Sequence, residues 1–527
     1  MCSTVRFCIQ TSLLVLPLAL AVPAQVLFAP ATYPASFPSQ TTSLTSRVVA
    51  PVDLDGDGDM DLICGQDNGC LSGSPGCGLW DPDDPGGLVL RSNDGMTNLL
   101  PPIHIGAGAW SGHGVAVADL DRDGDPDVLS LGRQNGIGGA GAMFCVLTND
   151  GVGNLAAPVT QGVPTWVSHM MVGDFDGDGN PDAALHGTIG GQTHVRLMFG
   201  DGAGGMAPGP QIQLTTIASH GIAGDLEGDG KDEIMLASGL GVLVLSTSAT
   251  GFPATATLPV GALGAPHSLA LGDWNADGTP DIATLFSVLG ANELWTLTNN
   301  GSGTSPTLSS VPLPTGIGQL QSICTFDADG DGDDDLATGW VGPSSSVGKI
   351  LVNDSGTFSP AAVSVPLGDG PDLMTLADGA GSLSHLVSAD RQSMTLTMVL
   401  NQSPRVDVIG TPTIGAPLQL RFMSPTDAGL AYQAALSTAT TPPVQIGDGR
   451  IIHLALSPIL SYSMMPMQPH FSGFSGTLDA TGVASGTVSV PNDPNLVGLQ
   501  FYLAFLALDP NAPSGIRHIS GPRSASL

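Results

Sequence analysis

A nine-residue acidic motif recurs six times along the chain, at intervals of 48 to 66 residues. Every copy has Asp at its first and fifth positions, Gly at its sixth and an acidic residue at its ninth. The copies, called loops one to six below, begin at Asp53, Asp119, Asp174, Asp225, Asp273 and Asp327. Repetition at such a period indicates a fold built from equivalent units that pack on one another.

Each motif lies in the same sequence context. An apolar run precedes it, as at 115–118, and a second strand-like run follows it, as at 182–185. A third apolar run ends in a turn of Asn, Asp and Gly, and a proline-containing segment comes last. These last segments are expected near 99–105, 155–162, 206–214, 252–260, 306–313 and 358–366. Four short strands in a unit of about 50 residues are typical of one blade of a β-propeller.

The two ends of the repeat region predict how the ring closes. A seventh, degenerate motif at 376–384 keeps two glycines and loses nearly all of the acids. Its unit has no fourth strand, whereas residues 26–30 have the pattern of a fourth strand with no unit before them. We predict that residues 26–30 complete the seventh unit, because a ring closed in this way leaves no open sheet edge.

The predicted fold is therefore all-β: a seven-bladed β-propeller over residues 25–403, followed by a small C-terminal β-sandwich over residues 404–527. The second region lacks the repeat and alternates apolar and polar residues, as at 476–490. Residues 1–24 combine a basic start, a short apolar run and small residues, which predicts a signal peptide. A membrane anchor is the alternative, but this run is short for a bilayer core of about 30 Å. The protein is expected to be secreted or at the cell surface, with no membrane span.

The charge of the chain restricts its partners. Lys and Arg number 14 against 47 Asp and Glu, for a net charge of −33, which argues against nucleic acid as a partner. Hydrophobic residues make up 42%, which is too many for a disordered chain. Of the 47 acids, 44 are Asp, which indicates short carboxylates on turns that cap the backbone or hold cations.

The motif and its flanking strands resemble the FG-GAP/VCBS repeat of integrin α-subunit propellers and many secreted bacterial proteins. The resemblance covers about 380 residues, because the motifs recur in phase from Asp53 to Asp335 and the flanking strands extend the repeat region at both ends. It implies a seven-bladed propeller with calcium in the loops between the first two strands of its blades. The seventh blade departs from the pattern, so no site is expected there.

The chemistry of the loop also predicts calcium. Ca²⁺ takes six to eight oxygen ligands, and a tight loop can direct the side chains of positions one, three, five and nine inward together with the carbonyl of position seven. These ligands are Asp53, Asp55, Asp57, Asp59 and Asp61; Asp119, Asp121, Asp123, Asp125 and Asp127; Asp174, Asp176, Asp178, Asn180 and Asp182; Asp225, Glu227, Asp229, Lys231 and Glu233; Asp273, Asn275, Asp277, Thr279 and Asp281; and Asp327, Asp329, Asp331, Asp333 and Asp335. We expect about six Ca²⁺ ions, with weaker sites in loops four and five. Solvated turns without metal, and Mg²⁺, are the alternatives.

Four histidines recur five or six residues before the first loop aspartate. They are His113, His169, His220 and His267. A strand of that length places them at the face opposite the loops, near the central channel. One interpretation is a candidate ligand face at the channel mouth, and the other is a small polar slot that contacts only backbone and water.

The sequence indicates a secreted calcium-binding propeller that acts as a binding or adhesion module for a carbohydrate or protein ligand. A secreted polysaccharide lyase or hydrolase that uses the channel face is the alternative, and a purely structural surface protein is a third. No catalytic residue is predicted, because none of the common hydrolase or phosphate-binding motifs occurs.

Overall fold

The structure is a computed structural model of the chain. It describes residues 28–527 except 35–44, 57–59, 68–86, 94–98, 102, 106–111, 137–138, 259–265, 276, 289–290, 302–306, 312, 314–317, 330–332, 343–344, 354–355, 359–362, 369–370, 378–383, 391–394, 448–449 and 466–467. The predicted signal peptide lies outside the described residues.

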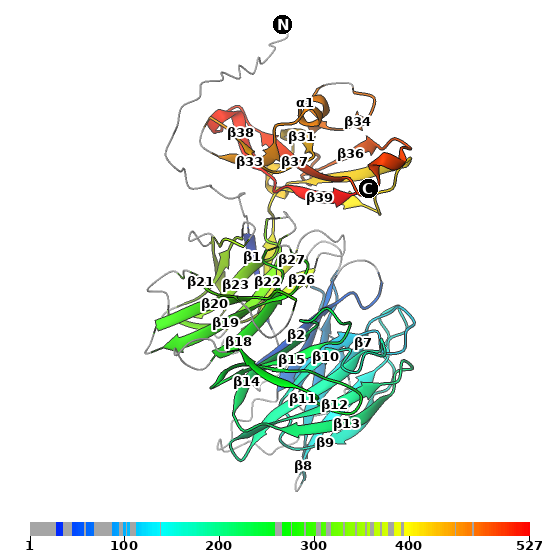
Figure 1. The fold of residues 1–527 in the computed structure, drawn as a ribbon, viewed down its shortest axis with the longest axis vertical. Coiled ribbons are helices and arrows are strands. Elements are labelled where there is room, and N and C mark those ends of the chain that lie inside the picture. The colour runs from blue at the N-terminus through cyan, green and yellow to red at the C-terminus, as the bar shows by residue number, and fades with distance from the viewer. Residues whose placement is uncertain are drawn as a thin grey trace.

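Antiparallel sheets of four strands follow one another along the first part of the chain (Figure 1). The first contains β2 (Thr45–Val52), β3 (Asp61–Asp67), β4 (Gly87–Arg91) and β5 (Ile103–Ile105). The second contains β6 (Gly112–Ala118), β7 (Asp127–Gly136), β8 (Gly139–Leu147) and β9 (Val159–Val163). The third contains β10 (His169–Gly173), β11 (Asp182–Ile189), β12 (Gln192–Gly200) and β13 (Met206–Gln213).

The next three sheets repeat this order. The fourth contains β14 (Ala218–Gly224), β15 (Glu233–Ser238), β16 (Gly241–Leu245) and β17 (Thr255–Leu258). The fifth contains β18 (Pro266–Gly272), β19 (Asp281–Val288), β20 (Ala291–Thr298) and β21 (Thr307–Val311). The sixth contains β22 (Gln319–Phe326), β23 (Asp335–Val341), β24 (Ser346–Leu351) and β25 (Val363–Leu367). Each of the six predicted outer segments overlaps the fourth strand of its sheet, and only β9 and β25 extend beyond the predicted segment, by one residue each.

The seventh sheet joins the two ends of the repeat region. It contains β26 (Pro371–Ala377), β27 (Ser384–Asp390) and β28 (Thr395–Asn401), and β1 (Phe28–Pro34) pairs with β28 as its outer strand. The predicted closure by the N-terminal segment is confirmed, although the strand ends four residues later than the sequence suggested. The first strands of the sheets contact one another in chain order, and β26 contacts β2, so the ring is closed.

The core of this ring lies between neighbouring sheets. One apolar cluster joins Ile63 and Leu90 of the first sheet to Val128 and Cys145 of the second, and equivalent clusters follow around the ring. The last cluster joins Val387 of the seventh sheet to Leu62 of the first. Strands buried on both faces explain the continuous apolar runs in the sequence. The repeat region is thus an all-β propeller, and its described residues form seven sheets.

Two further sheets pack on a shared core in the C-terminal region. One contains β29 (Arg405–Ile409), β30 (Pro417–Met423), β36 (Val483–Ser489) and β34 (Phe471–Ser472). The other contains β35 (Ser475–Thr477), β31 (Ala431–Ser437), β37 (Gln500–Leu508), β38 (Ile516–Ile519) and β39 (Arg523–Ser526). Phe422 of the first sheet packs against Tyr432 and Phe505 of the second, which is the arrangement of a β-sandwich.

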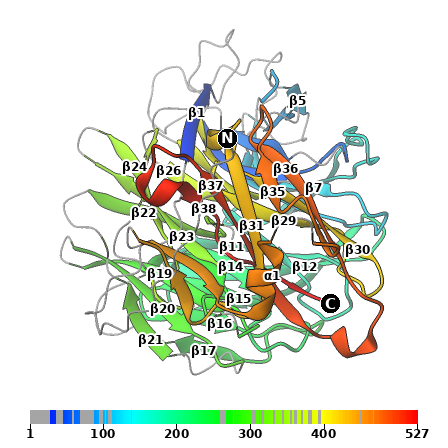
Figure 2. The ribbon, with the colours of Figure 1, turned by 90° about the horizontal axis from the view of Figure 1, so that it is seen from above.

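Short elements complete this region. The strands β32 (Pro443–Gln445) and β33 (Ile451–Ala455) form a hairpin, and the helix α1 (Pro458–Ser463) begins where Ser457 accepts a hydrogen bond from the Leu460 N–H. Three 3₁₀ turns cover Pro425–Asp427, Pro494–Leu496 and Pro513–Gly515. Figures 1 and 2 together show the C-terminal sheets lying over one end of the ring.

Candidate metal centre

The acidic loops connect the first strand of a sheet to its second strand, as predicted. In each of the six, the ninth residue is the first residue of the second strand: Asp61, Asp127, Asp182, Glu233, Asp281 and Asp335. Since every first strand lines the ring in the same direction, the loops recur at equivalent corners of the blades. Loop one is described only in part, because Asp57 and Asp59 lie outside the described residues, as does Asp331 of loop six.

The ninth-position carboxylate holds each loop closed. Asp127 is fully buried and accepts the Leu120 N–H at 2.9 Å with one oxygen and the Asn149 N–H at 2.7 Å with the other. Asp182 accepts the Phe175 and Gly200 N–H groups in the same way, at 2.9 and 2.8 Å. The sequence predicted that this carboxylate is a metal ligand. Each oxygen already accepts a backbone hydrogen bond, so a metal ion would have to use the remaining lone pairs.

Burial without a basic partner raises the pKa of these carboxyl groups. Desolvation raises the pKa of Asp182 to about 7 and that of Glu233 to about 7, and backbone N–H donors offset only part of the effect. The pKa of Asp281 is raised to about 6 for the same reason. A nearby cation would lower the pKa of such a buried carboxyl group, because a cation favours the ionised carboxylate.

The first and sixth positions form the turn of the loop. The first aspartate accepts the N–H of the sixth residue at 3.1 Å in loop two and 2.8 Å in loop three, with the same bond in loops four and five. The sixth residue is glycine because its φ is positive, +98° at Gly124 and +81° at Gly179. In loops one to four the fourth position is also left-handed, and in loop two Arg122 occupies it at φ +63°.

Carboxylate oxygens of positions one, three and nine converge in three loops. Within each group the ligand atoms lie within 4.8 Å of one another: Asp119, Asp121 and Asp127; Asp174, Asp176 and Asp182; Asp327, Asp329 and Asp335. Burial and the neighbouring carboxylate of Asp123 raise the pKa of Asp121, and Asp119 Oδ1 is buried with no hydrogen-bond partner among the described residues. An oxygen-only, anionic donor set of this kind fits a hard divalent cation such as Ca²⁺.

Comparison with known proteins identifies the repeats. A family model described as FG-GAP-like repeat matches residues 53–130, 225–284 and 273–338. The chain carries FG-GAP-like repeats. The matched ranges include loops one, two, four, five and six, whereas β2 and β14, the strands before loops one and four, lie outside them.

Integrin alpha-7 from Homo sapiens is 30% identical to the chain over 162 residues. The match covers 28% of this chain and 14% of the integrin, so the chain spans about a seventh of that relative. Among solved structures, one described as the crystal structure of BBS1N in complex with ARL6DN, soaked with lead, aligns with a TM-score of 0.44 at 12% identity. That alignment covers 70% of this chain and 96% of the other.

The FG-GAP-like repeats of loops four and five differ from the other loops. Among the described residues, their carboxylates form no group of three as close as those of loops two, three and six. In loop four, Lys231 Nζ lies 3.3 Å from Asp229 Oδ2, and in loop five Asn275 donates to Asp277 at 3.0 Å. Internal donors thus occupy part of the carboxylate capacity in both loops, but Asn180 donates to Asp178 at 2.7 Å in loop three as well, so the missing group of three is what distinguishes loops four and five. Weaker binding at these loops stays a prediction.

The position-seven residue was predicted to offer its carbonyl oxygen. In loops two to five, the backbone N–H of this residue donates a hydrogen bond to the carboxylate of position five. These bonds run from Asp125 to Asp123, Asn180 to Asp178, Lys231 to Asp229 and Thr279 to Asp277, at 2.8 to 3.0 Å. This bond orders the turn that presents the carbonyl. Metal binding by the carbonyl itself stays a prediction in every repeat.

Contacts between neighbouring FG-GAP-like repeats were not predicted. An asparagine after the third strand donates its side-chain amide to the carbonyl of position two in the preceding loop. These pairs are Asn149 to Leu54, Asn299 to Leu226, Asn353 to Trp274 and Asn401 to Ala328, at 2.7 to 2.8 Å. In the third repeat, Gly200 replaces the asparagine, and the Gly204 N–H four residues later donates to the Leu120 carbonyl at 3.0 Å. The recurring Asn in the turn after the third strand was the available signal.

The four recurring histidines all lie on the first strand of a repeat, at the end away from the loop: His113 on β6, His169 on β10, His220 on β14 and His267 on β18. The side chains of His113 and His267 lie outside the described residues. His169 stacks on His186 of β11, with ring centroids 4.7 Å apart, and His220 Nδ1 accepts the Leu269 N–H at 3.3 Å. His186 is buried and was not predicted, because it has no counterpart in the other repeats.

Membrane insertion through a helix finds no support in the described part of the chain, where no helix is long and apolar enough to cross a bilayer.

Proposed function

We propose that the protein is an exported propeller that binds Ca²⁺ in its repeat loops and acts as a binding or adhesion module for a carbohydrate or protein ligand. The observation that carries the calcium proposal is the convergence of three carboxylates at the same corner in loops two, three and six. Like charges gathered at one point repel one another unless a cation lies between them.

The loop positions have different roles at such a site. Positions one and three supply carboxylate oxygens, and the ninth-position carboxylate both closes the loop and faces the same point. A bound Ca²⁺ would supply charge neutralisation and a rigid crosslink between the first two strands of the blade. Mg²⁺ fits less well, because it prefers a small octahedron with retained waters, whereas Ca²⁺ accepts a larger and more flexible oxygen cage.

Calcium binding can be measured directly. The full chain is stripped with a chelator, dialysed, and titrated with CaCl₂ in an isothermal calorimeter, with MgCl₂ as the comparison. We expect about six Ca²⁺ per chain, with loops four and five filling last, and weaker binding of Mg²⁺. The variant Asp176→Asn should remove one tight site, because it takes a carboxylate from loop three. If CaCl₂ gives no heat of binding with the chelator-stripped protein, the calcium proposal is wrong.

The binding role rests on the propeller and its FG-GAP-like repeats. A glycan array and a pull-down with extracellular proteins identify the ligand class, and polysaccharide turnover assays test the enzymatic alternative. Binding without product formation supports the module. Polysaccharide cleavage that is lost on replacement of His113 or His169 would establish the enzyme instead.

A further inference from the structure

The residue at the eighth position differs among the loops. It is Pro126, Pro181 and Pro280 in loops two, three and five, but Asp232 and Asp334 in loops four and six. Each acid thus belongs to a loop that follows a proline-bearing loop in the ring. Neither aspartate is among the predicted metal ligands, and the strand geometry directs both toward the neighbouring blade.

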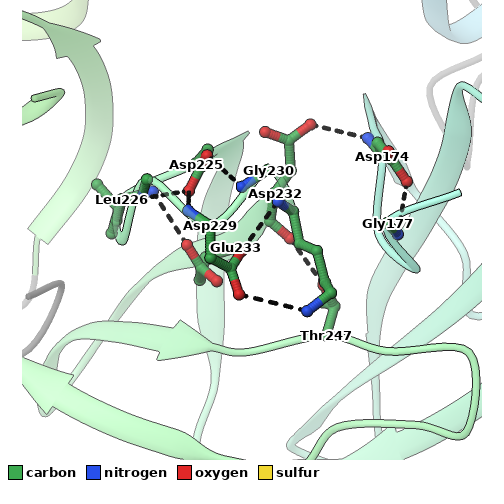
Figure 3. Close-up of polar contacts among 11 residues, drawn as sticks. Asp174, Gly177, Asp225, Leu226, Asp229, Gly230, Asp232, Glu233 and Thr247 are labelled. Atoms are coloured by element: carbon green, nitrogen blue, oxygen red, sulfur yellow. Dashed lines mark hydrogen bonds and ion pairs between the residues drawn. The ribbon is translucent and has the colours of Figure 1, made fainter. Parts of the chain in front are cut away.

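Asp232 and Asp334 bind the backbone of the preceding loop at its first metal-ligand position. Asp232 Oδ2 accepts the Asp174 N–H at 2.8 Å (Figure 3). The Asp232 N–H donates back to the Asp174 carbonyl at 2.9 Å. Asp334 Oδ2 accepts the Asp273 N–H at 3.0 Å. Both aspartates are half-buried at the interface between two blades.

A glycine precedes each of the contacted residues and allows this approach. A Cβ at Gly173 would collide with the Asp232 carboxylate, and a Cβ at Gly272 would lie 2.9 Å from Asp334 Oδ2. The same local solution therefore occurs at two separate interfaces. Between the fourth and fifth sheets, Asn299 donates to the Leu226 carbonyl at the second position of loop four.

We propose that Asp232 and Asp334 are positioning residues that couple the metal sites in pairs, loop three with loop four and loop five with loop six. This rests on the proposed calcium function. Asp232 precedes Glu233, and Asp334 precedes Asp335, the closing carboxylates of their own loops. Metal binding that orders loop six fixes Asp334, which then holds the backbone of Asp273 ready for metal in loop five. By thermodynamic reciprocity, occupancy of loop five favours loop six equally.

Trp274 provides a reporter for one loop. It lies at position two of loop five and is almost completely buried, so its indole can transfer excitation to Tb³⁺ bound there. Tb³⁺ takes oxygen ligands as Ca²⁺ does. The signal lost in a Trp274→Phe variant identifies the loop-five contribution, and the apparent Tb³⁺ affinity is read from a titration of the full chain.

The coupling is measured as a double-mutant cycle. Inactivating loop six with Asp327→Asn and Asp329→Asn should weaken Tb³⁺ binding at loop five at least about fivefold, the lower end of typical allosteric couplings. With Asp334→Ala, the same inactivation should have no further effect. Asp334→Asn should keep the coupling, because its amide oxygen still accepts the Asp273 N–H. Asp232→Ala, the equivalent change in the other pair, is the matched control and should leave loop five unchanged.

Each other outcome overturns the pairing. If inactivation of loop six leaves the Tb³⁺ affinity of loop five unchanged, the two loops are not coupled. If Asp232→Ala weakens loop five as much as Asp334→Ala does, the coupling is not pairwise. If Asp334→Asn and Asp334→Ala have equal effects, the coupling comes from the charge of Asp334 and not from its hydrogen bond. Circular dichroism checks the fold, and Asp334→Ser, too short to reach Asp273, replaces the alanine variant if that one unfolds. Absence of any Tb³⁺ or Ca²⁺ binding by the unmodified chain would instead refute the proposed function.

Discussion

The propeller and the C-terminal sandwich neutralise their buried acids in different ways. Residues 1–403 contain 41 of the 47 acidic residues and 9 of the 14 basic ones, whereas residues 404–527 contain 6 and 5. In the sandwich, Asp427 is paired with His518 at 2.7 Å and Arg517 at 3.2 Å. In the propeller, the partners of Asp127 and Asp182 within the described residues are backbone N–H groups.

The pKa values follow this difference. Burial raises the pKa of Asp427, but hydrogen bonds from His518 and Ser424 and the charge of Arg517 more than offset it, so its pKa is lowered. Burial raises the pKa of Asp182 to about 7 with only backbone donors against it. The sandwich thus carries its own counter-charges, while in the propeller the proposed calcium ions would supply them.

Removal of calcium should give the largest difference in stability between the propeller and the sandwich. Each site that is filled at 100 times its Kd adds about 2.7 kcal/mol to the stability of the folded propeller, and several sites act together. Differential scanning calorimetry with Ca²⁺ and with excess chelator should show one transition falling and the other unchanged. The sandwich transition is identified by its insensitivity. If both transitions move together, or neither moves, the contrast between the two regions is wrong.

Removal of an acid from the sandwich should destabilise that region to the same extent with and without calcium. Asp427→Ala leaves Arg517, His518 and Ser424 without their shared partner and should cost about 3 kcal/mol of unfolding free energy, the same in Ca²⁺ and in chelator. Urea denaturation measures this. Asp479→Asn is the control, since Asp479 is exposed and caps a turn at Thr481. A loss at Asp427 that depends on Ca²⁺ would contradict the assignment.

The periodic features of the fold could be predicted from the sequence. Motif spacing gave the units, and the unmatched strand near Phe28 gave the closure, because each depends on residues close together in the chain. Contacts between units could not be predicted in this way. Asn149 and Leu54 are 95 residues apart, and Asp334 and Asp273 are 61 apart, so only the ring geometry brings them together.

The candidate site divides along the same line. The residue types and spacing identified the loop carboxylates, and the structure groups three of them in loops two, three and six. The backbone bonds of the ninth carboxylate were missed, because they depend on how Asn149 and Gly200 return from the third strand.

The smallest expected effect contrasts two histidines, His186 in the propeller and His518 in the sandwich. His518 Nδ1 is hydrogen-bonded to Asp427, whereas both ring nitrogens of His186 are buried with no hydrogen-bond partner among the described residues. Burial, and then the charges of His169 on β10 and His220 on β14, lower the pKa of His186 well below its usual value. The folded protein therefore binds this proton less readily than the unfolded chain.

The sign of the pH dependence follows from that lowered pKa. The stability of the propeller is unaffected by His186 above the unfolded pKa of about 6.5, and below it falls by as much as about 1.4 kcal/mol per pH unit. His186→Leu should remove this dependence, because an apolar side chain has no proton to gain on unfolding. Urea denaturation of both proteins at pH 7.5, 6.5 and 5.5, in saturating Ca²⁺ to keep the loop carboxylates bound, measures the difference. Parallel stability curves for the two proteins would show that His186 has a proton acceptor or donor in the folded state, and the contrast with His518 would be lost.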